Sequence, residues 1–533
     1  MTATRPAQGW LGPLLLRLHF YAAILVGPFL LISAASGALY ALSPQLEKVV
    51  YAQELTAPSE ASPLPLAAQV EAAQAHVGQD ARLAAVRPAP EPGDTTRVMY
   101  ADDALGESET RAIFLDPGTG ETRGDLTVYG TSGALPLRGW IDQLHRNLHL
   151  GDAGRLYSEL SASWLGVIAV AGLGLWIRRA RRARRRRELL RPDLRARGYR
   201  RTLSLHSSAG IWVLLGALFL AATGITWSQY GGGNIGTVRE ALGFTTHAVD
   251  AQLPAAAGGA AASAAGAGEH GAHEGHGTGA PADAQDSGGA ASGHGAHGSA
   301  DEAPAGAPTD GEEPASTGSA AGPASARTDP AAIDDVLAAG QAVNIDTGLV
   351  EILPPADEGS AWVVQEIQRS YPTEVDAVAV DGGTLEVVDR SDFADQDLAA
   401  KLTRWGIDLH MGTMFGLVNQ IVLFLVASTL VAMILWGYAM WWQRRPTRGG
   451  RGPGRPPRRG ALRRAPWWGV GLVLLVAAGI GVALPLVGVS LVVFVLIDAV
   501  LGRLRPAPPA ARTDGRPAGA PQEPTSSPAR RGA

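Results

Sequence analysis

A set of long apolar runs constrains this chain more than any other feature of its sequence. A helix needs ~20 consecutive apolar residues to cross a hydrocarbon layer of ~30 Å. Four runs reach that length, at about 14–42, 157–177, 205–227 and 414–442. A further apolar block at 467–501 would extend roughly 50 Å as one helix, so we expect a hairpin that turns near Pro485. The sequence thus predicts a mainly α fold, a polytopic helical membrane bundle of four core spans plus a C-terminal hairpin.

Arginine is concentrated in two short loops between these runs. The loop 178–201 contains thirteen arginines, and the loop 444–464 contains nine. Because arginine near the ends of spans is retained in the cytoplasm, both loops and the N-terminus are predicted to be cytoplasmic, in a multi-pass protein of the plasma membrane. The alternative, that these arginines bind nucleic acid, is disfavoured because spans flank both loops, where contact with anionic membrane lipids is expected.

The two long segments on the extracytoplasmic side each have the pattern of a small α/β module. The first has helical spacing at 64–77, β-rich runs at 82–86, 97–100 and 111–115, and a turn at 116–121. The second repeats this order, with a helix at 330–342 and β-rich runs at 348–353, 361–367 and 377–388, the last folded at 381–383. Such repetition predicts two similar domains.

These features divide the chain into eleven predicted segments. In order they are the cytoplasmic N-terminus and first span (1–43), the first module (44–135), an outer interfacial segment and second span (136–178), an Arg-rich loop (179–202), the third span (203–228), an extracytoplasmic region with an insertion (229–328), the second module (329–405), the fourth span (406–443), a second Arg-rich loop (444–466), the hairpin (467–501) and a disordered cytoplasmic tail (502–533).

Histidines stand near the ends of the four spans, in two layers. His19 and His206 are predicted at the cytoplasmic face, and His145, His149 and His410 at the outer face. One histidine at a membrane interface is explained by its amphipathic ring. A histidine in or just before the first turn of four successive spans instead favours axial ligands for haem iron, because imidazoles from facing helices can supply both axial positions. The number suits two haems, which would divide the path of an electron across the layer.

The chain contains no cysteine. This excludes disulfides, cysteine-ligated iron–sulfur clusters and the C-x-x-C-H attachment of c-type haem. The cytoplasmic loops are too short for a flavin or nicotinamide domain, and no G-x-G-x-x-G unit follows a predicted strand. An electron donor must therefore be a separate cytoplasmic protein or a membrane quinol.

The insertion at 251–327 consists mostly of Ala, Gly, Pro, Ser, acidic residues and His, so it is predicted to be disordered. Flexible tracts rich in histidine bind ions such as Cu(II), Zn(II) or Ni(II), and an iron ion is a further candidate. The alternative is a low-complexity spacer with no ligand. The candidate metal ligands are His270, His273, His276, His294 and His297.

Four stretches in a fixed order resemble the PepSY-associated transmembrane proteins, also called iron-regulated membrane proteins. They run from Leu18-His19 to Ser36-Gly37-Ala38-Leu39, from Leu144-His145-Arg146-Asn147-Leu148 to Gly172-Leu173-Gly174-Leu175-Trp176, from Leu205-His206 to Thr223-Gly224-Ile225, and from Leu409-His410-Met411-Gly412 to Trp441-Trp442-Gln443-Arg444-Arg445-Pro446.

The resemblance implies four core spans, outer PepSY modules and, for some members, bis-histidine b-type haems that reduce ferric siderophores or other outer substrates. His19, His145, His206 and His410 match the histidines of the family, whereas His149 has no counterpart there. His145 is therefore the favoured outer ligand, although a spacing of four would place His149 on the same helical face. This sequence departs from the family in its His-rich insertion, in the C-terminal hairpin and in a second module that lacks the Thr-Gly turn of the first.

Two other functions are open at this point. The chain could be a regulatory protein whose PepSY modules bind peptides or restrain an enzyme, or an acquisition protein that captures metal or haem without redox work. The favoured hypothesis is a conduit for electrons to a ferric chelate or other metal outside the cell, acting as a haem-dependent ferric siderophore reductase.

Overall fold

A computed structural model describes residues 9–106, 108–183, 187–244, 248–254, 329–444, 457 and 459–504. Four of its helices are long and apolar enough to cross a membrane, which confirms the four predicted spans. They are α1 (Leu11–Val50), α5 (Gly151–Ala180), α7 (Tyr199–Thr226) and α12 (Gly416–Gln443). The helix α1 has 40 residues and would extend about 60 Å, so one end continues well beyond a hydrocarbon layer.

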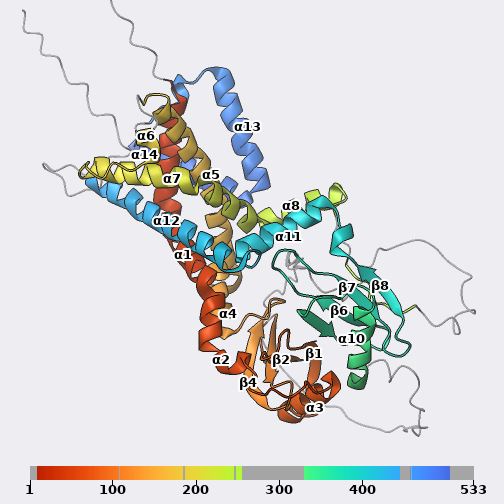
Figure 1. Ribbon diagram of the computed structural model, residues 1–533. Helices are drawn as coiled ribbons and strands as arrows, with labels where there is room; N and C mark the ends of the chain where they lie inside the picture. Colours follow the sequence, from red (N-terminus) through yellow and green to blue (C-terminus); the bar gives the residue numbers. More distant parts are fainter. Residues whose placement is uncertain are drawn as a thin grey trace, which may run out of the picture. The chain divides into compact units, whose positions relative to one another are not determined.

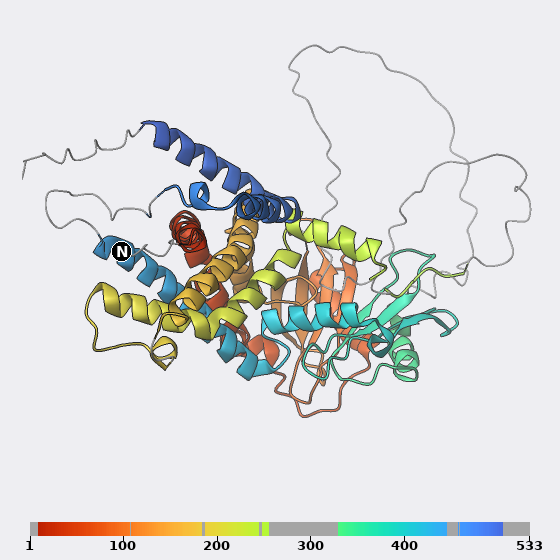
Figure 2. The ribbon, with the colours of Figure 1, turned by 90° about the horizontal axis from the view of Figure 1, so that it is seen from above.

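The four spans pack together as a bundle (Figures 1 and 2). Both α1 and α7 contact α5 and α12, so the four helices surround a shared interior. Small residues permit close approach at these contacts. At Gly27 the ring of Tyr438 lies so near that a Cβ atom would be 2.6 Å from its hydroxyl oxygen. That hydroxyl donates a hydrogen bond to the carbonyl of Ile24 (3.0 Å), which joins α12 to α1.

The last apolar block is divided as predicted. The helix α13 (Trp467–Ala483) ends two residues before Pro485, where α14 (Pro485–Leu504) begins. Proline has no backbone N–H and is tolerated at the start of a helix rather than in its interior. The side chain of Asn234, in α8 (Tyr230–Ala241), donates hydrogen bonds to the carbonyls of Val482 (3.1 Å) and Ala483 (3.2 Å) at the end of α13.

Shorter helices lie between the spans and the strands or between successive apolar helices. They are α2 (Ala52–Leu55), α3 (Leu66–Val77), α4 (Pro136–Asn147), α6 (Arg187–Leu190), α10 (Ile333–Gln341) and α11 (Leu398–Met411), with 3-10 turns at Pro330–Ala332, Phe393–Asp395 and Leu462–Arg464. The helices α4 and α11 each precede a span directly. The sequence analysis assigned His145 and His410 to the segments that lead into those spans. In the structure each of them lies on a separate short helix.

Eight antiparallel strands form one sheet in the order β4-β3-β2-β1-β5-β6-β7-β8. The first module contributes β1 (Arg82–Arg87), β2 (Thr96–Ala101), β3 (Glu109–Leu115) and β4 (Thr122–Tyr129), and the second contributes β5 (Val350–Leu353), β6 (Trp362–Glu366), β7 (Ala377–Val380) and β8 (Val387–Ser391). The expected strands are present, and β4 is an additional one. The modules were predicted as two similar domains, and in the structure they share this sheet. Pairing of β1 with β5, at Val86 and Ile352, covers edges that would otherwise expose unpaired backbone groups.

The two modules also share one apolar core and one buried ion pair. Val70 of α3 and Val336 of α10 pack in the same cluster as Val86 and Ile352 of the sheet. Arg87 in β1 and Glu351 in β5 are 2.7 Å apart, with side chains only 9% and 7% exposed. A pair that is withdrawn from water needs every polar atom satisfied, and Gln365 donates to the second oxygen of Glu351 (2.6 Å).

Each module folds its last two strands over the same kind of turn. The side-chain oxygens of Asp116 and Asp381 accept hydrogen bonds from the backbone two residues later, at Gly118 and Gly383. The second module has no Thr-Gly sequence here, yet Leu385 adopts a positive φ of 60°. The turn is therefore retained with a leucine in a left-handed conformation that glycine adopts more readily.

The same order of elements occurs twice along the chain. A span, a helix with four strands, a short helix and a second span follow one another first in α1, the first module, α4 and α5. They follow again in α7, the second module, α11 and α12. The repetition first visible in the modules thus extends to the membrane spans.

Candidate cofactor site between the spans

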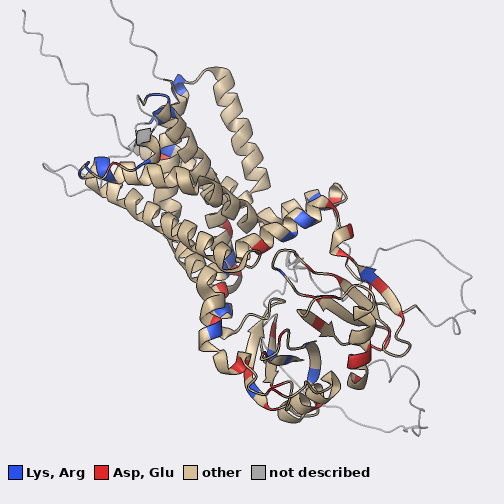
Figure 3. Ribbon diagram, viewed as in Figure 1, with Lys and Arg blue, Asp and Glu red and all other residues tan. Residues whose placement is uncertain are grey.

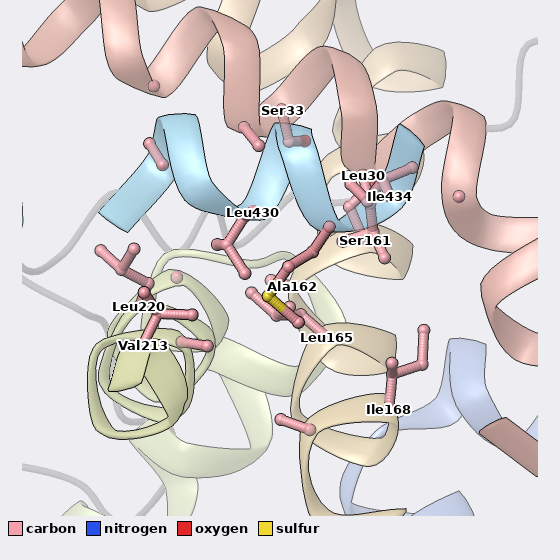
Figure 4. Close-up of a pocket in the computed structure, with 18 of the residues that line it drawn as sticks. Leu30, Ser33, Ser161, Ala162, Leu165, Ile168, Val213, Leu220, Leu430 and Ile434 are labelled. Carbon is pink, nitrogen blue, oxygen red and sulfur yellow. The ribbon is translucent and has the colours of Figure 1, made fainter. Parts of the chain in front are cut away.

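A cavity of about 730 Å³ runs between the four spans and reaches α4 and α11. Figure 4 shows side chains of all four spans facing it, among them Leu30, Ala162, Leu220 and Leu430. A volume of several hundred Å³ with mostly apolar walls is typical of a site for a cofactor or other small molecule. The predicted ligands His19, His145, His206 and His410 all line it.

Two of these histidines lie on spans, and we call them the span pair. His19 is on α1 and His206 on α7, and their ring centres are 6.1 Å apart with the ring planes at 81°. Two metal–imidazole bonds of about 2 Å each, and about 1 Å from Nε2 to each ring centre, give a separation of about 6 Å. A separation of this size would suit two imidazoles that hold one metal ion between them.

The other two lie on the short helices, and we call them the short-helix pair. His145 is in the last turn of α4, and His410 is in the last turn of α11. Gly412, with a φ of 80°, ends α11 in a left-handed conformation, a common end for helices. Burial lowers the pKa of both imidazoles, which lie outside the four spans, and the proximity of His145 lowers that of His410 further. Both rings are therefore neutral at pH 7, the form that binds metal ions.

Backbone carbonyls of neighbouring spans hold the span pair. Nδ1 of His19 donates to the carbonyl of Ile168 in α5 (3.0 Å), and Nδ1 of His206 donates to that of Met433 in α12 (3.1 Å). Because a carbonyl can only accept, Nδ1 must carry the proton in each ring. The other nitrogen, Nε2, is then the one with a free lone pair.

Hydroxyl groups hold the short-helix pair. Nδ1 of His145 lies 3.0 Å from Oγ of Ser36, and Nδ1 of His410 lies 2.6 Å from Oγ1 of Thr223. Each hydroxyl donates its own hydrogen to a carbonyl of its helix, Ser36 to Ile32 (2.8 Å) and Thr223 to Phe219 (2.8 Å). A hydroxyl that donates its single hydrogen to the carbonyl is left to accept from Nδ1–H of the histidine.

All four rings thus present the same nitrogen to the cavity. Among the described residues, Nε2 of these histidines makes no hydrogen bond, while Nδ1 always does. A histidine that binds a metal ion almost always donates its second N–H to a carbonyl or another acceptor, which fixes the tautomer and the direction of the ring. The hydrogen bonds therefore fit two pairs of axial ligands.

Ser36 and Thr223 are each separated from a histidine of the span pair by the same number of residues. Ser36 follows His19 by seventeen residues, and Thr223 follows His206 by seventeen. Seventeen residues of helix rise about 26 Å, close to the ~30 Å of a hydrocarbon layer. The sequence reading missed the role of Ser36 and Thr223, although the repeated spacing of a histidine and a hydroxyl–glycine pair was a signal for them.

Glycines leave room for the histidine rings. A Cβ atom at Gly172 would be 3.2 Å from Cε1 of His19, and one at Gly37 would be 3.1 Å from Cε1 of His145. Gly37 and Gly224 directly follow the two hydroxyl residues, and a Cβ atom at Gly224 would be 4.0 Å from Cε1 of His410. These glycines therefore let the rings approach the helix backbones.

Arginines are found at both ends of the cavity. Arg179 and Arg444 line it near the span pair, and Arg146, Arg155 and Arg369 line it near the short-helix pair. Guanidinium groups form strong paired hydrogen bonds with carboxylates. The arginines at each end are therefore suited to bind carboxylate groups of a ligand in the cavity.

Of the remaining predicted ligands the structure describes His149, which does not line this cavity. The helix α4 ends at Asn147, and both Leu148 and His149 have a positive φ. His149 is therefore not on the helical face of His145, and its exposed ring stacks on Trp140 with centres 5.1 Å apart. His270, His273, His276, His294 and His297 lie outside the described residues.

Comparison with known proteins agrees with this architecture. The family model for the PepSY-associated TM region matches residues 16–444, which include all four spans and both histidine pairs. No curated protein matches the chain.

Proposed function

The chain belongs to the PepSY-associated transmembrane family, and we propose that it transfers electrons across a membrane through two b-type haems. His19 and His206 would hold one haem, and His145 and His410 the other. The hydrogen bonds carry this proposal, because in all four rings Nδ1 is the hydrogen-bonded nitrogen and Nε2 makes no hydrogen bond within the described part of the chain. When bound, haem supplies a one-electron couple whose potential depends on its ligands and their hydrogen bonds.

The residues of the chain have separate tasks in this proposal. The carbonyls of Ile168 and Met433 and the hydroxyls of Ser36 and Thr223 keep each imidazole in one tautomer. The apolar side chains between the pairs exclude water from the middle of the path. Arginines near each pair neutralise carboxylates of the macrocycle.

The proposed direction of electron transfer rests on the orientation of the bundle in the membrane, which the positions of the basic residues favour. Figure 3 shows basic residues at the end of α5, the start of α7 and the end of α12. Arginine at span ends favours the cytoplasmic side, so the span pair and the N-terminus would be cytoplasmic in the plasma membrane. A reporter fused at Arg187 would then be cytoplasmic, and one fused within 288–293 would be exported. The reverse result would invert the direction of transfer.

The proposed acceptor is a ferric chelate such as a siderophore, or another metal, outside the cell. A cytoplasmic protein or a quinol would be the donor. The sheet is attached to the end of the bundle where the short-helix pair lies, because the carboxylate of Glu47 in α1 accepts from the backbone of Leu135 (2.8 Å) just before α4. The PepSY modules are thus positioned to contact an acceptor beside that pair.

A reduced-minus-oxidised absorption spectrum with haem quantification tests the proposal. The full chain, purified after expression with haem available, is expected to contain two low-spin haems and to be reoxidised by a ferric siderophore. Reconstitution in vesicles with a reductant only inside should still reduce ferric chelate outside. A chain without a Soret band would overturn the proposal and favour a regulatory role, while bound haem without reoxidation would favour acquisition.

A further inference from the structure

A cluster of carboxylates in the second module lies apart from the cavity. Asp346, Glu366 and Glu374 offer oxygens that all lie within 4.8 Å of one another. Glu366 is the last residue of β6 and is 3% exposed, while Asp346 is open to solvent. Like charges this close repel one another. Some other group must offset that repulsion if all three are ionised.

The buried carboxylate of Glu366 has one oxygen without a partner. Its Oε1 accepts hydrogen bonds from the backbone of Asp346 and Thr347, both 2.9 Å. Its Oε2 is buried and has no hydrogen-bond partner among the described residues. A buried charged oxygen without a hydrogen-bond partner costs free energy of folding. A bound ligand that contacts this atom would remove that cost.

Two threonines adjacent in the sequence to residues of the cluster also have buried hydroxyl oxygens. Oγ1 of Thr347, next to Asp346, and Oγ1 of Thr373, next to Glu374, are buried without a partner within the described part of the chain. Thr373 is 7% exposed. The first module has a tyrosine, Tyr100, among the core residues near the end of β2, where β6 has Glu366. The acidic cluster is therefore not needed to build a module of this kind.

We propose that Asp346, Glu366 and Glu374 bind a calcium ion. A set of oxygen donors selects a hard cation rather than the Cu(II) or Zn(II) that imidazoles prefer. Three carboxylates favour Ca²⁺ over Mg²⁺, because Mg²⁺ keeps several waters and is usually held by one or two carboxylates. The exposed Asp346 gives the ion a path of entry.

The ion would also fix the segment 367–376, which connects β6 to β7. Glu366 precedes this segment and Glu374 lies near its end, so one ion would join both ends. Within it, the backbone N–H of Tyr371 donates to the carbonyl of Met414 (2.8 Å), just beyond α11. Arg369 donates to the hydroxyl of Thr131 (3.1 Å) and lines the cavity. Bound Ca²⁺ would thus hold a segment that reaches the short-helix pair.

Calorimetric titration of the full chain with CaCl₂ in detergent, after treatment with a chelator, tests this site. We expect one binding event that is weakened by at least about tenfold in Glu374→Gln and Glu366→Gln, because ligand charge sets the affinity for Ca²⁺. The matched control is Glu386→Gln, which changes an exposed glutamate of the same module and should bind like the unchanged protein.

Thermal unfolding separates loss of the site from loss of the fold. Without Ca²⁺, Glu374→Gln should unfold at the same temperature as the unchanged chain or higher, since one repelling charge is gone, and added Ca²⁺ should no longer raise that temperature. Equal Ca²⁺ binding in all variants would overturn the proposal. So would variants that lose binding of ZnCl₂ but keep that of CaCl₂.

Discussion

The span pair and the short-helix pair present the same nitrogen to the cavity but are held by different groups. Main-chain carbonyls of Ile168 and Met433 orient His19 and His206. Side-chain hydroxyls of Ser36 and Thr223 orient His145 and His410. A carbonyl is present whatever residue occupies the position, whereas a hydroxyl is lost in a single substitution. The short-helix pair is therefore the one whose properties a point mutation can tune.

The two pairs also differ in their attachment. The span pair is embedded in α1 and α7, while the short-helix pair lies on helices that continue from the sheet. Tyr51 and Glu47 at the end of α1 accept hydrogen bonds from the backbone of Leu137 (3.0 Å) and Leu135 (2.8 Å), where α4 begins. Changes in the sheet should therefore be felt at the short-helix pair first.

The largest expected effect is loss of one haem when a ligand is removed. His19→Ala or His206→Ala should abolish one haem signal, and His145→Ala or His410→Ala the other. Within a pair, the double substitution should cost no more than either single one, because a site that lacks one ligand is already broken. Haem content and low-spin spectra measure this.

His149→Ala is the matched control for the ligand substitutions, since its ring is exposed and outside the cavity. It should leave both haem signals unchanged. If it removes the signal of the short-helix pair while His145→Ala does not, the assignment of that ligand is wrong.

A smaller effect is expected from the buried ion pair between the modules. Glu351→Ala leaves Arg87 buried without its partner, which should lower the free energy of unfolding by about 3 to 5 kcal/mol. Arg87 also donates to the carbonyls of Thr131 (2.6 Å) and Ser132 (3.2 Å), which line the cavity. Denaturant titration should show the loss, and the haem of the short-helix pair should be released before that of the span pair. Glu358→Ala, at an exposed position of the same module, is the control. Release of both haems at the same denaturant concentration would contradict the difference in attachment between the two histidine pairs.

The hydroxyl residues should change a redox potential without removing a haem. Ser36→Ala and Thr223→Ala each delete a hydrogen bond worth about 1 kcal/mol, which corresponds to roughly 40 mV for a one-electron couple. A potentiometric titration should show a shift in one haem only, that of the short-helix pair. Rescue by Ser36→Thr would identify the hydroxyl as the cause. A shift in both haems would contradict the separate control of the two pairs.

The smallest effect is expected at the far edge of the sheet. Arg111 in β3 and Asp125 in β4 form a half-exposed ion pair (2.6 Å), and its hydrogen bond lowers the pKa of Asp125. A lowered folded-state pKa gives stability above the ordinary value near 3.8 that is lost as the pH falls through the folded value. Asp125→Asn should therefore cost less than about 1 kcal/mol at pH 7 and nothing at low pH. Neither haem should respond.

Much of the helix bundle could be predicted, because the properties that determine a span are contained in one continuous segment of sequence. Length and apolarity identified the four spans, and Pro485 indicated the break in the last block. The position of a histidine relative to a span end selected five candidates, of which all but His149 line the cavity. The spacing between Ser36 and His19 was equally readable, but its meaning depends on a ring contributed by another helix.

The rest depended on contacts that no local pattern encodes. Pairing of β1 with β5 joins strands that are more than 260 residues apart in the chain. The end of α4 was missed for another reason, since Leu148 and His149 take left-handed conformations without a glycine to signal them. The second turn was predicted at 381–383, but its likeness to the first was not, because Leu385 stands where the first turn has Gly120.

The repeated order of elements has a consequence for how the two repeats depend on each other. Each histidine pair takes one member from the first repeat, α1 to α5, and one from the second, α7 to α12: His19 with His206, and His145 with His410. Neither repeat alone supplies both histidines of a pair, so in the proposed holoprotein each iron would link the two repeats. Two such repeats made as separate polypeptides would therefore need each other to bind haem.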